Sequence, residues 1–554
     1  MTDYYDVVLI HPPSFYNFRQ KPILPGPVDR TVPIYTYIFI MFPIGMVSIA
    51  SFLESRGLKV KVFNLAEKML VEKRLDVEEF LSRVKAQVYA IGLHWSVHTE
   101  GAIETAKICK SLHPDSLVIL GGLTATCFAE EILNELKFID GVVRGEAEIA
   151  LCKLIKNLVK YNVTEAFKKT PNLTYRNCDG KILSTETSKV IRSLDYLDFT
   201  RLDLVEPIER TITSPITSSK LWNIPICRGC LLNCATCGGS RHSYRVLLNR
   251  NSPAFRSPQK IFDDFTRLDE LGVKSVFLFQ DPRMGGEQYV NELLRVFKRA
   301  RWSNIRNVGL ELFWPASRSY LEKLKNSGIA ENIGLSISPE SGNDNVRYAH
   351  GRHYPTHDLI KTVNYCVELG IPIGVFFLVS LGYETYETLH ETWGLWEKLL
   401  SRNTVSKGLG RVSVDFGPML LLDPGSPAFF NPDRYGYKLI FKKFLDYYNG
   451  LKYNHWKFWI SYETTYFSRF DIGKIILNSW ETLSAIKWKL GFLNEKEYEL
   501  EMLRIRFEKI VYEKIDDILS KNPEEANELC REIVEISRDP LLSWIYVSTE
   551  GVRL

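Results

Sequence analysis

The chain lacks any marked excess of charge. Its 554 residues carry 70 Lys and Arg against 66 Asp and Glu, which leaves a net charge of +4. A balance this close gives no basic surplus of the kind that favours nucleic-acid binding. Glutamine is scarce as well, whereas Lys, Glu, Ile and Tyr are plentiful. That bias is compatible with a thermophilic source.

Cysteine is also sparse, with ten residues in the whole chain. Four of them fall between Cys227 and Cys237, and the others are scattered. Scattered cysteines and the lack of a secretory leader argue against a disulfide framework and predict a cytoplasmic protein. The hydrophobic fraction of 45% and charged fraction of 25% are those of an ordinary soluble protein, long enough for about two to four domains.

A long uninterrupted hydrophobic run is missing too. Residues 32–53 carry no charge over a length that could span a bilayer, but two prolines and Gly45 interrupt them. We expect an apolar loop over 34–42, then a buried helix over 43–56 that ends near Gly57. No transmembrane span is predicted. The loop either packs as an Ω-type segment or faces an apolar ligand.

Apolar strands and helical segments alternate through the first third of the chain. Besides the helix at 43–56, the pattern predicts helices near 76–84, 100–112 and 128–136. Such alternation is typical of a parallel, doubly wound sheet, in which ligands bind beyond the carboxyl ends of the strands. The residues expected there are His11–Ser14, His94–Thr99, Gly121–Thr126 and Arg144–Glu148.

The middle of the chain first becomes polar and then returns to αβ alternation. Within 159–220, "LTYRNCDGKILST" predicts a hairpin with its turn at Asp179 and Gly180. Apolar strands then recur about six times up to residue 430. Acidic residues fall at three strand ends, where barrel enzymes place their chemistry: Asp281, Glu311 and Glu340. From 431 onward the sequence is rich in aromatics and reads as helical, a pattern that usually forms a core.

The clustered cysteines, in "ICRGCLLNCATCGGS", admit three interpretations. Disulfides need an oxidising compartment. Two zinc knuckles would normally stand roughly a dozen or more residues apart, whereas only three residues separate Cys230 from Cys234. An iron–sulfur cluster can take its thiolates from one short loop. If Cys230, Cys234 and Cys237 bind in a C-x3-C-x2-C pattern, one iron of a 4Fe-4S cluster stays open for chemistry.

"RGCLLNCATC" closely resembles the motif of the radical S-adenosylmethionine enzymes. The resemblance implies that Cys230, Cys234 and Cys237 hold a 4Fe-4S cluster and that Cys227 is not a ligand. In that family S-adenosylmethionine chelates the open iron and is cleaved to a 5′-deoxyadenosyl radical. Further matches to the family imply cofactor contacts at Glu340 in "PESG", at Ser338 beside it, and at Asp281 in "FQDP". Thr236 stands where relatives often carry an aromatic residue near the adenine.

The first third resembles the cobalamin-binding domain that precedes many radical S-adenosylmethionine cores. The matching pieces are "FPIGMVSIASFLESRG", the glycine pair 121–122 and "RGEAE". The resemblance implies that the cofactor's nucleotide tail lies against Ser96, Gly121, Gly122 and Thr124. The alternative is a domain that has kept the fold and uses its crevice otherwise.

One motif of other cobalamin proteins is missing. The Asp-x-His-x-x-Gly sequence that supplies a cobalt ligand elsewhere is absent after the first strand, so bound cobalamin is expected without histidine coordination. His94, Trp95 and His98 follow the third strand. A histidine in such a loop is more often structural than ligating, and no spacing overrides that expectation.

Together these observations predict an α/β protein with four parts. They are a Rossmann-like cobalamin-binding domain over 1–158, a linker with a hairpin over 159–220, a partial (β/α)6 radical S-adenosylmethionine barrel over 221–430, and a helical, aromatic-rich C-terminal domain over 431–554. The family resemblance covers residues 1–430.

The resemblance implies an enzyme whose radical takes hydrogen from an unactivated carbon and forms a C–C bond. The apolar loop and the aromatic C-terminal part favour a hydrophobic, lipid-like substrate and allow peripheral contact with a membrane surface. Archaeal relatives that close cyclopentane rings in tetraether membrane lipids offer the most specific expectation. A cobalamin-dependent C-methyltransferase is the alternative, and an electron donor such as ferredoxin or flavodoxin is expected. A non-catalytic cobalamin or iron–sulfur sensor would instead use Cys227 to complete the cluster's coordination.

Overall fold

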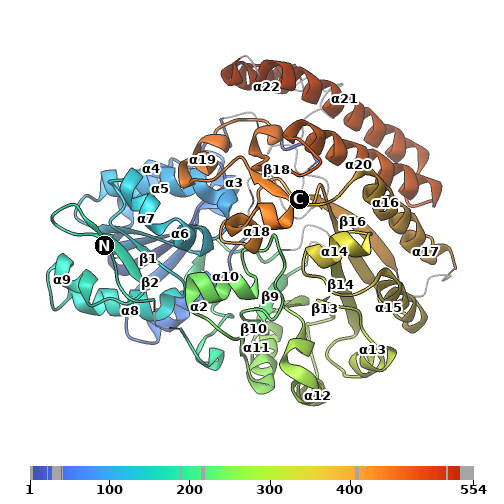
Figure 1. Ribbon diagram of the computed structural model, residues 1–554. Helices are drawn as coiled ribbons and strands as arrows, with labels where there is room; N and C mark the ends of the chain where they lie inside the picture. The colour runs from blue at the N-terminus through green and yellow to red at the C-terminus, as the bar shows by residue number, and fades with distance from the viewer. Residues whose placement is uncertain are drawn as a thin grey trace.

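The computed structural model of the protein describes residues 4–20, 23–27, 39, 41–187, 190–213, 219–405, 411–519 and 522–536. Two parallel sheets lie next to each other, each wrapped in helices, and a C-terminal part lies across both (Figure 1). Of the apolar loop expected over 34–42, only Phe39, Met41 and Phe42 are within the described residues. Among all the residues that the structure describes, no helix is long and apolar enough to cross a membrane.

The N-terminal sheet has eight strands in the order β7-β6-β5-β4-β3-β1-β2-β8. Its five central strands are parallel because helices connect them on both faces. These strands are β1 (Tyr4–His11), β2 (Val60–Asn64), β3 (Lys85–Gly92), β4 (Leu117–Gly121) and β5 (Gly141–Val143). In β1, the run from Val7 to Ile10 is buried throughout, as expected for a strand covered on both faces.

All four predicted helices of this domain are present. They are α2 (Gly45–Glu54), α4 (Val77–Arg83), α5 (Thr99–Leu112) and α7 (Ala129–Glu135). Four helices were not predicted: α3 (Leu65–Val71), α6 (Leu123–Cys127), α8 (Ala147–Leu158) and α9 (Val163–Lys168).

The predicted hairpin is confirmed, but it does not belong to a free linker. β6 (Leu173–Arg176) and β7 (Ile182–Ser184) pair antiparallel across the turn, where Gly180 takes φ +80°. β6 also pairs with β5. At the other edge β8 (Val205–Glu206) pairs with β2, after the short 3-10 turns η2 (Leu194–Tyr196) and η3 (Leu202–Leu204). Residues expected to bridge two domains therefore complete the N-terminal sheet at both edges.

The second sheet is the predicted partial barrel of six parallel strands, ordered β16-β15-β14-β13-β12-β9. The strands are β9 (Leu221–Pro225), β12 (Ser275–Phe279), β13 (Asn307–Leu312), β14 (Asn332–Glu340), β15 (Ile373–Val379) and β16 (Val412–Pro418). Around them lie η4 (Pro282–Gly285) and helices α11 (Pro258–Glu270), α12 (Gly286–Phe297), α13 (Arg318–Lys325), α14 (Asp344–Ala349), α15 (Thr356–Leu369), α16 (Tyr386–Leu400) and α17 (Arg402–Val405).

The cysteine loop leaves the barrel directly after β9. Its first residues form β10 (Cys227–Arg228), which pairs antiparallel with β11 (Ala254–Phe255). Between these two strands runs α10 (Arg241–Leu248), whose N-cap Ser240 accepts a hydrogen bond from the backbone N–H of Ser243. The β10–β11 pairing and the capped helix hold the loop at both ends.

The C-terminal part packs its aromatic residues into a core, as the sequence predicted. Tyr447, Trp456 and Tyr462 are fully buried, and the Trp456 ring stacks on Tyr512 with 5.3 Å between centroids. Its elements are α18 (Pro427–Phe430), η5 (Asp433–Tyr435), β17 (Tyr437–Leu439), α19 (Phe444–Gly450), η6 (Trp456–Trp459), β18 (Tyr462–Thr464), α20 (Arg469–Lys489), α21 (Glu495–Leu519) and α22 (Pro523–Ile536). Residues 537–554 lie outside the described part.

This C-terminal part also ties the two sheets together. Glu131 of α7 accepts a hydrogen bond from the backbone N–H of Phe444 at 2.7 Å. On the barrel side, Trp393 of α16 donates to Ser479 of α20 at 3.1 Å. The orange α18, α19 and β18 therefore lie over the junction between the blue sheet and the barrel (Figure 1).

Candidate active site

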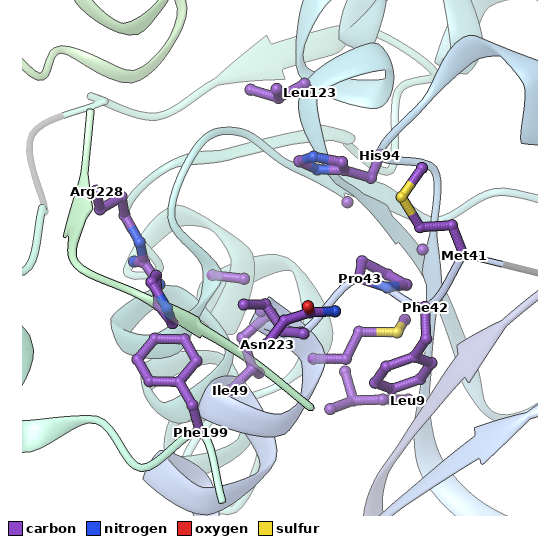
Figure 2. Close-up of a pocket in the computed structure, with 18 of the residues that line it drawn as sticks. Leu9, Met41, Phe42, Pro43, Ile49, His94, Leu123, Phe199, Asn223 and Arg228 are labelled. Carbon is purple, nitrogen blue, oxygen red and sulfur yellow. The ribbon is translucent and has the colours of Figure 1, made fainter. Parts of the chain in front are cut away.

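The carboxyl-end loops of the N-terminal sheet and the first strands of the barrel enclose one cavity of about 960 Å³. The N-terminal domain contributes residues that follow β3, β4 and β5, and the barrel contributes β9, the start of the cysteine loop and the end of β12. Figure 2 shows His94 and Leu123 on one side of the space and Asn223, Arg228 and Phe199 on another. The N-terminal sheet therefore directs its usual ligand-binding end at this space, and the barrel borders it with β9 and the end of β12.

Backbone groups of the cysteine loop point at its sulfurs. The N–H of Leu232 donates to Cys230 Sγ and the N–H of Gly239 donates to Cys237 Sγ, both at 3.3 Å. The loop is anchored by Ala235, whose N–H donates to His350 O at 3.1 Å. Such donors stabilise negative charge on sulfur, the form in which cysteine binds iron.

Apart from Cys227, the three cysteines of the loop differ in exposure: Cys234 is buried, Cys230 is partly buried and Cys237 is exposed. Burial raises the pKa of Cys230. Burial raises the pKa of Cys234 to about 12, and the cation of Arg352 acts in the opposite direction. Free thiolates are therefore disfavoured here, whereas a bound metal centre deprotonates its thiols outright.

Cys227 differs from these three. Its Sγ donates to the carbonyl of Gly229 at 3.6 Å, and the residue lines the cavity. Burial, and then Cys230, raise its pKa to about 12. Within the described part of the chain, no three His, Cys, Asp or Glu side chains are placed to hold a single metal ion. Three sulfurs from one loop, with Cys227 engaged elsewhere, fit an iron–sulfur cluster bound at three corners.

Strained backbone marks the barrel rim beside the loop. Gln280, Glu340 and Ser380 stand at or just beyond the ends of β12, β14 and β15, with φ of +66°, +69° and +65°. Non-glycine residues in this region cost of order 1–3 kcal/mol and concentrate at functional sites. The three strained positions mark the rim that carries the predicted cofactor contacts.

Glu340, a predicted contact of S-adenosylmethionine, lies at the end of β14 and pairs with Arg352. Its Oε1 accepts from Arg352 Nε at 3.1 Å, and Arg352 also donates to Phe313 O at 3.2 Å. Glu340 and Arg352 both influence the pKa of Cys234. Ser338 precedes Glu340 on β14 and is partly exposed. The role of both residues in binding S-adenosylmethionine stays a prediction.

Asp281 is already committed to structure. Its Oδ1 accepts from Arg283 N and Nε, both at 2.9 Å, and its Oδ2 accepts from Phe313 N at 2.8 Å. The side chain is fully buried. Its assignment as a cofactor contact stays untested, but both oxygens are occupied by the protein.

Glu311 is a further acidic group at this rim, at the end of β13. Its Oε2 accepts from the backbone N–H of Gln280 at 2.7 Å. Burial raises its pKa, and its charge in turn influences the thiols of Cys227 and Cys230. The sequence placed Glu311 at a strand end but gave no reason to prefer it to Asp281.

On the N-terminal side, Gly121 and Gly122 line the cavity. Gly122 has φ +114°, and a Cβ there would lie 2.5 Å from Leu93 O and 2.6 Å from His94 N. Only glycine fits a chain this close. The loop after β4 therefore packs directly against the backbone of the loop after β3. Gly121 and Gly122 also carry no side chain into the cavity, and we call this pair the glycine cradle.

Ser96 and Thr124, the other two predicted contacts, are buried and do not line the cavity. Thr124 N and Oγ1 both donate to His94 O, at 3.2 and 3.1 Å. Ser96 O accepts from Thr99 Oγ1 at 2.6 Å. These two residues shape the loop after β3, and their contact with a cofactor stays a prediction.

A buried ion network, missed from the sequence, joins the two domains next to the cavity. Arg228 NH2 lies 2.7 Å from Glu148 Oε1, and Arg228 NH1 lies 3.1 Å from Glu146 Oε2. Glu146 Oε1 also pairs with Arg250 NH2 at 2.6 Å. Both carboxylates are almost completely buried. "RGEAE" and "RGC" were visible in the sequence, but about 80 residues separate them and nothing local indicates their pairing.

Comparison with known proteins agrees with both resemblances. Residues 224–393 match the Radical SAM superfamily, and residues 31–155 match the B12 binding domain. The chain therefore carries both domains, in the order expected. They imply a 4Fe-4S cluster, S-adenosylmethionine and cobalamin, the three predicted cofactors, and the sulfur set and glycine cradle fit the cluster and the cobalamin.

Two curated relatives and one solved structure illustrate the range of related proteins. The chain is 25% identical to the anaerobic magnesium-protoporphyrin IX monomethyl ester cyclase of Cereibacter sphaeroides over 307 residues, 53% of this chain and 47% of that protein. It is 24% identical to the hopanoid C-3 methylase of Methylococcus capsulatus over 245 residues, 43% of each. The chain thus spans about half the length of these relatives.

The solved structure is the radical S-adenosylmethionine methyltransferase TsrM from Kitasatospora setae, with tryptophan substrate and a S-adenosylmethionine analogue bound. It superposes with a TM-score of 0.61 at 15% identity, over 88% of this chain and 89% of that chain. At this identity the likeness concerns the fold, which is shared across nearly the whole of both chains.

Proposed function

We propose that this cobalamin-dependent radical S-adenosylmethionine enzyme forms a C–C bond at an unactivated carbon of a largely apolar substrate, by methyl transfer. One observation carries the proposal. A single large cavity is bounded by the glycine cradle of the B12-binding domain and by Cys227 and Arg228 of the cluster loop. Cys230, Cys234 and Cys237 do not line the cavity, so the radical source is expected beyond its edge at Cys227. A methyl donor in the cavity and a radical source at its edge can act on the same substrate.

The chain's own residues are suited to excluding water and holding an apolar ligand. Leu9, Met41, Phe42 and Ile49 line the cavity together with Phe199 from the far side (Figure 2). The bound cofactors supply the radical and the methyl group. The walls supply affinity, because burial of apolar surface stabilises a complex by about 25 cal/mol per Å², and they keep a reactive radical away from water.

The residues that line the cavity also indicate where the substrate enters. Met41 and Phe42, the described end of the predicted apolar loop, are part of its wall. Of the described residues, those that line the cavity all precede residue 281. The aromatic residues of the C-terminal part therefore pack in their own core and not in the wall of the cavity. We therefore propose entry beside the 41–44 segment, without a wall from the C-terminal part.

The relatives support methyl transfer ahead of ring closure. The names of the hopanoid methylase and of TsrM both describe methyl transfer. Ring closure, including cyclopentane formation in archaeal tetraether lipids, is the second candidate. It is favoured by the apolar cavity wall and by a relative that is named a cyclase. A lipid substrate, contact with a membrane surface and a ferredoxin or flavodoxin donor belong to this proposal.

Expression in cells that make ring-free tetraether lipids separates the two candidates. Feeding methionine with a deuterated methyl group labels the methyl of S-adenosylmethionine. Methyl transfer adds one labelled methyl per turnover to a lipid, whereas each new ring removes two hydrogens and adds no label. An unchanged lipid profile, with 5′-deoxyadenosine still formed by the purified protein, would contradict the lipid substrate.

A further inference from the structure

The segment that carries the cysteine loop contains no acidic residue. Neither Asp nor Glu occurs in the sequence from Arg210 to Phe262, a stretch that includes the whole loop and α10. Three of its cations are largely or fully buried and pair with carboxylates of other segments: Arg228, Arg250 and Arg256. Two others, Arg241 and Arg245, are exposed on α10. The exposed charge of this segment is therefore positive.

Arg241 and Arg245 lie one turn apart on the same face of α10. Within the described part of the chain, no hydrogen bond or ion pair engages either guanidinium group. Like charges at this spacing repel each other, so the pair weakens the helix slightly instead of stabilising it. An acidic surface placed against α10 would relieve that repulsion.

Exposed apolar side chains adjoin the two arginines. Val246 follows Arg245 on α10, and Leu231 lies in the cysteine loop. Phe430 of α18 is exposed too, and its ring lies against His242, with centroids 5.8 Å apart; α10 and α18 are neighbours in the fold (Figure 1). Single exposed apolar side chains are common, but three around one short helix indicate an interaction surface. We call these three residues and the two arginines the α10 surface.

The α10 surface adjoins the predicted cluster ligands. The backbone N–H of Arg241 donates to Leu232 O at 2.8 Å. The next N–H, of His242, donates to Asn233 Oδ1 at 3.0 Å. Both acceptors stand between the first two predicted ligands in the sequence. The first turn of α10 is therefore bonded to the loop that carries the thiolates.

Acidic residues of the neighbouring α18 region do not cancel this charge. After α18, η5 contributes Asp433 and Arg434, whose charges offset each other. Before α18, Asp423 is only partly exposed, and its Oδ2 accepts from the backbone N–H of Gly238 at 2.9 Å. One carboxylate against two arginines leaves the α10 surface with a net positive charge beside its apolar side chains.

We propose that the α10 surface docks the protein that supplies electrons to the cluster, a one-electron carrier with an acidic docking face. The inference rests on the proposed function, which requires such a donor, and adds the place where it binds. In the transfer the reduced carrier loses one electron and the oxidised cluster gains it, and no bond forms or breaks. Opposite charges orient the encounter, and the apolar side chains provide contact area at the loop that holds the cluster.

Binding to the cofactor-free, full-length protein tests the docking surface without turnover. The probes are an acidic 4Fe-4S ferredoxin and an acidic flavodoxin, measured by calorimetry at low and at high salt. Wild-type affinity should fall as salt rises, because salt screens exposed charges. Arg241→Glu with Arg245→Glu should weaken binding at least about tenfold at low salt, since like charges would then face each other.

A matched control separates docking from net charge. Arg295→Glu with Lys298→Glu, exposed at the end of α12, changes the net charge by the same amount and should weaken binding by less than about threefold. Equal weakening by the two double variants would overturn the inference, because net charge alone would then explain it. A wild-type protein that binds neither carrier would overturn it as well.

The rate of cluster reduction gives a second readout. In stopped flow with the reconstituted protein, Arg241→Glu with Arg245→Glu should be reduced at least about tenfold more slowly by reduced ferredoxin. Photoreduced deazaflavin, a small reductant that needs no docking surface, should reduce this variant and the wild type at similar rates. Slowing with both reductants would indicate a disturbed cluster and contradict docking. Absence of 5′-deoxyadenosine with every reductant would remove the proposed function, whereas the binding experiment would still decide the docking surface.

Discussion

The buried pair between Arg228 and Glu148 gives a sharp prediction about how the two domains are held together. Glu148 is 1% exposed, and Ser48 gives its carboxylate a further, long hydrogen bond of 3.4 Å. Replacing Arg228 with Met would leave this carboxylate buried with no cation beside it, because Arg250 pairs with Glu146. Removing one partner of a buried ion pair typically costs about 3–5 kcal/mol.

The expected loss for Arg228→Met is about 3 kcal/mol, the lower end of that range, because the arginine side chain is still 17% exposed. For a domain of 150–250 residues this corresponds to about 6–12 °C in Tm. Arg228→Met with Glu148→Leu should recover most of the loss, since an apolar pair of similar size has no buried charge. Arg245→Met, on the exposed face of α10, serves as the control and should change stability by less than about 0.5 kcal/mol.

The effect should also depend on pH. Burial raises the pKa of Glu148, and Arg228 more than offsets it, so the pKa in the folded protein is lowered. The wild-type carboxylate therefore stabilises the fold at pH values above the pKa that Glu148 has in the unfolded chain. It loses that contribution as pH falls through the lower pKa of the folded protein. In Arg228→Met the cation is gone and burial, the largest influence, raises the folded pKa of Glu148, so the variant loses stability as pH rises. The difference between the two proteins should widen from pH 5 to pH 8.

Thermal and urea unfolding of the cofactor-free proteins at pH 5 and pH 8 measure this difference. A variant within about 0.5 kcal/mol of wild type at both pH values, as for an ordinary surface substitution, would refute the buried-pair reasoning. A loss that is equal at both pH values would refute the charge argument and leave only lost packing.

The remaining predictions concern the cofactors. Cys230→Ala, Cys234→Ala or Cys237→Ala should lose iron and the cluster's visible absorbance, whereas Cys227→Ala should keep both; cluster loss in the Cys227 variant would contradict the three-ligand assignment. Gly122→Ala should weaken corrinoid retention, measured by gel filtration of the loaded protein, because its Cβ would meet Leu93 O at 2.5 Å; unchanged retention would contradict the cradle. Glu340→Gln should weaken S-adenosylmethionine binding in calorimetry, whereas Asp281→Asn should mainly lower stability, since its oxygens bond Arg283 and Phe313; the reverse result would contradict this division.

Local sequence patterns were enough to predict most of the fold. β1 to β5 and the six barrel strands are buried apolar segments with clear boundaries, and they stand where the alternation places them. α3 and α6 were missed because α3 begins at the residue after β2 and α6 begins two residues after β4, so no turn sequence separates these helices from the strands before them. The hairpin was predicted from its turn, but its pairing with β5 depends on residues about thirty positions away and leaves no local signal.

The candidate site was predictable where chemistry depends on spacing. The three cysteines follow from one short motif, whereas Asp281 and Glu311 look alike as strand-end acids in the sequence. Only the structure separates them, because both oxygens of Asp281 accept hydrogen bonds from Arg283 or Phe313, whereas Glu311 accepts one from the backbone N–H of Gln280. His94 and His98 are likewise indistinguishable until the fold bonds one and leaves the other at the cavity wall.

The central claim is radical chemistry at a cluster with an open iron, and formation of 5′-deoxyadenosine tests it most directly. The protein is reconstituted anaerobically with iron and sulfide, loaded with hydroxocobalamin, and given S-adenosylmethionine with dithionite in place of its electron donor. We expect 5′-deoxyadenosine from the wild type and from Cys227→Ala, and none from Cys234→Ala. A wild-type protein that holds its cluster and forms no 5′-deoxyadenosine would contradict the account and favour a non-catalytic sensor.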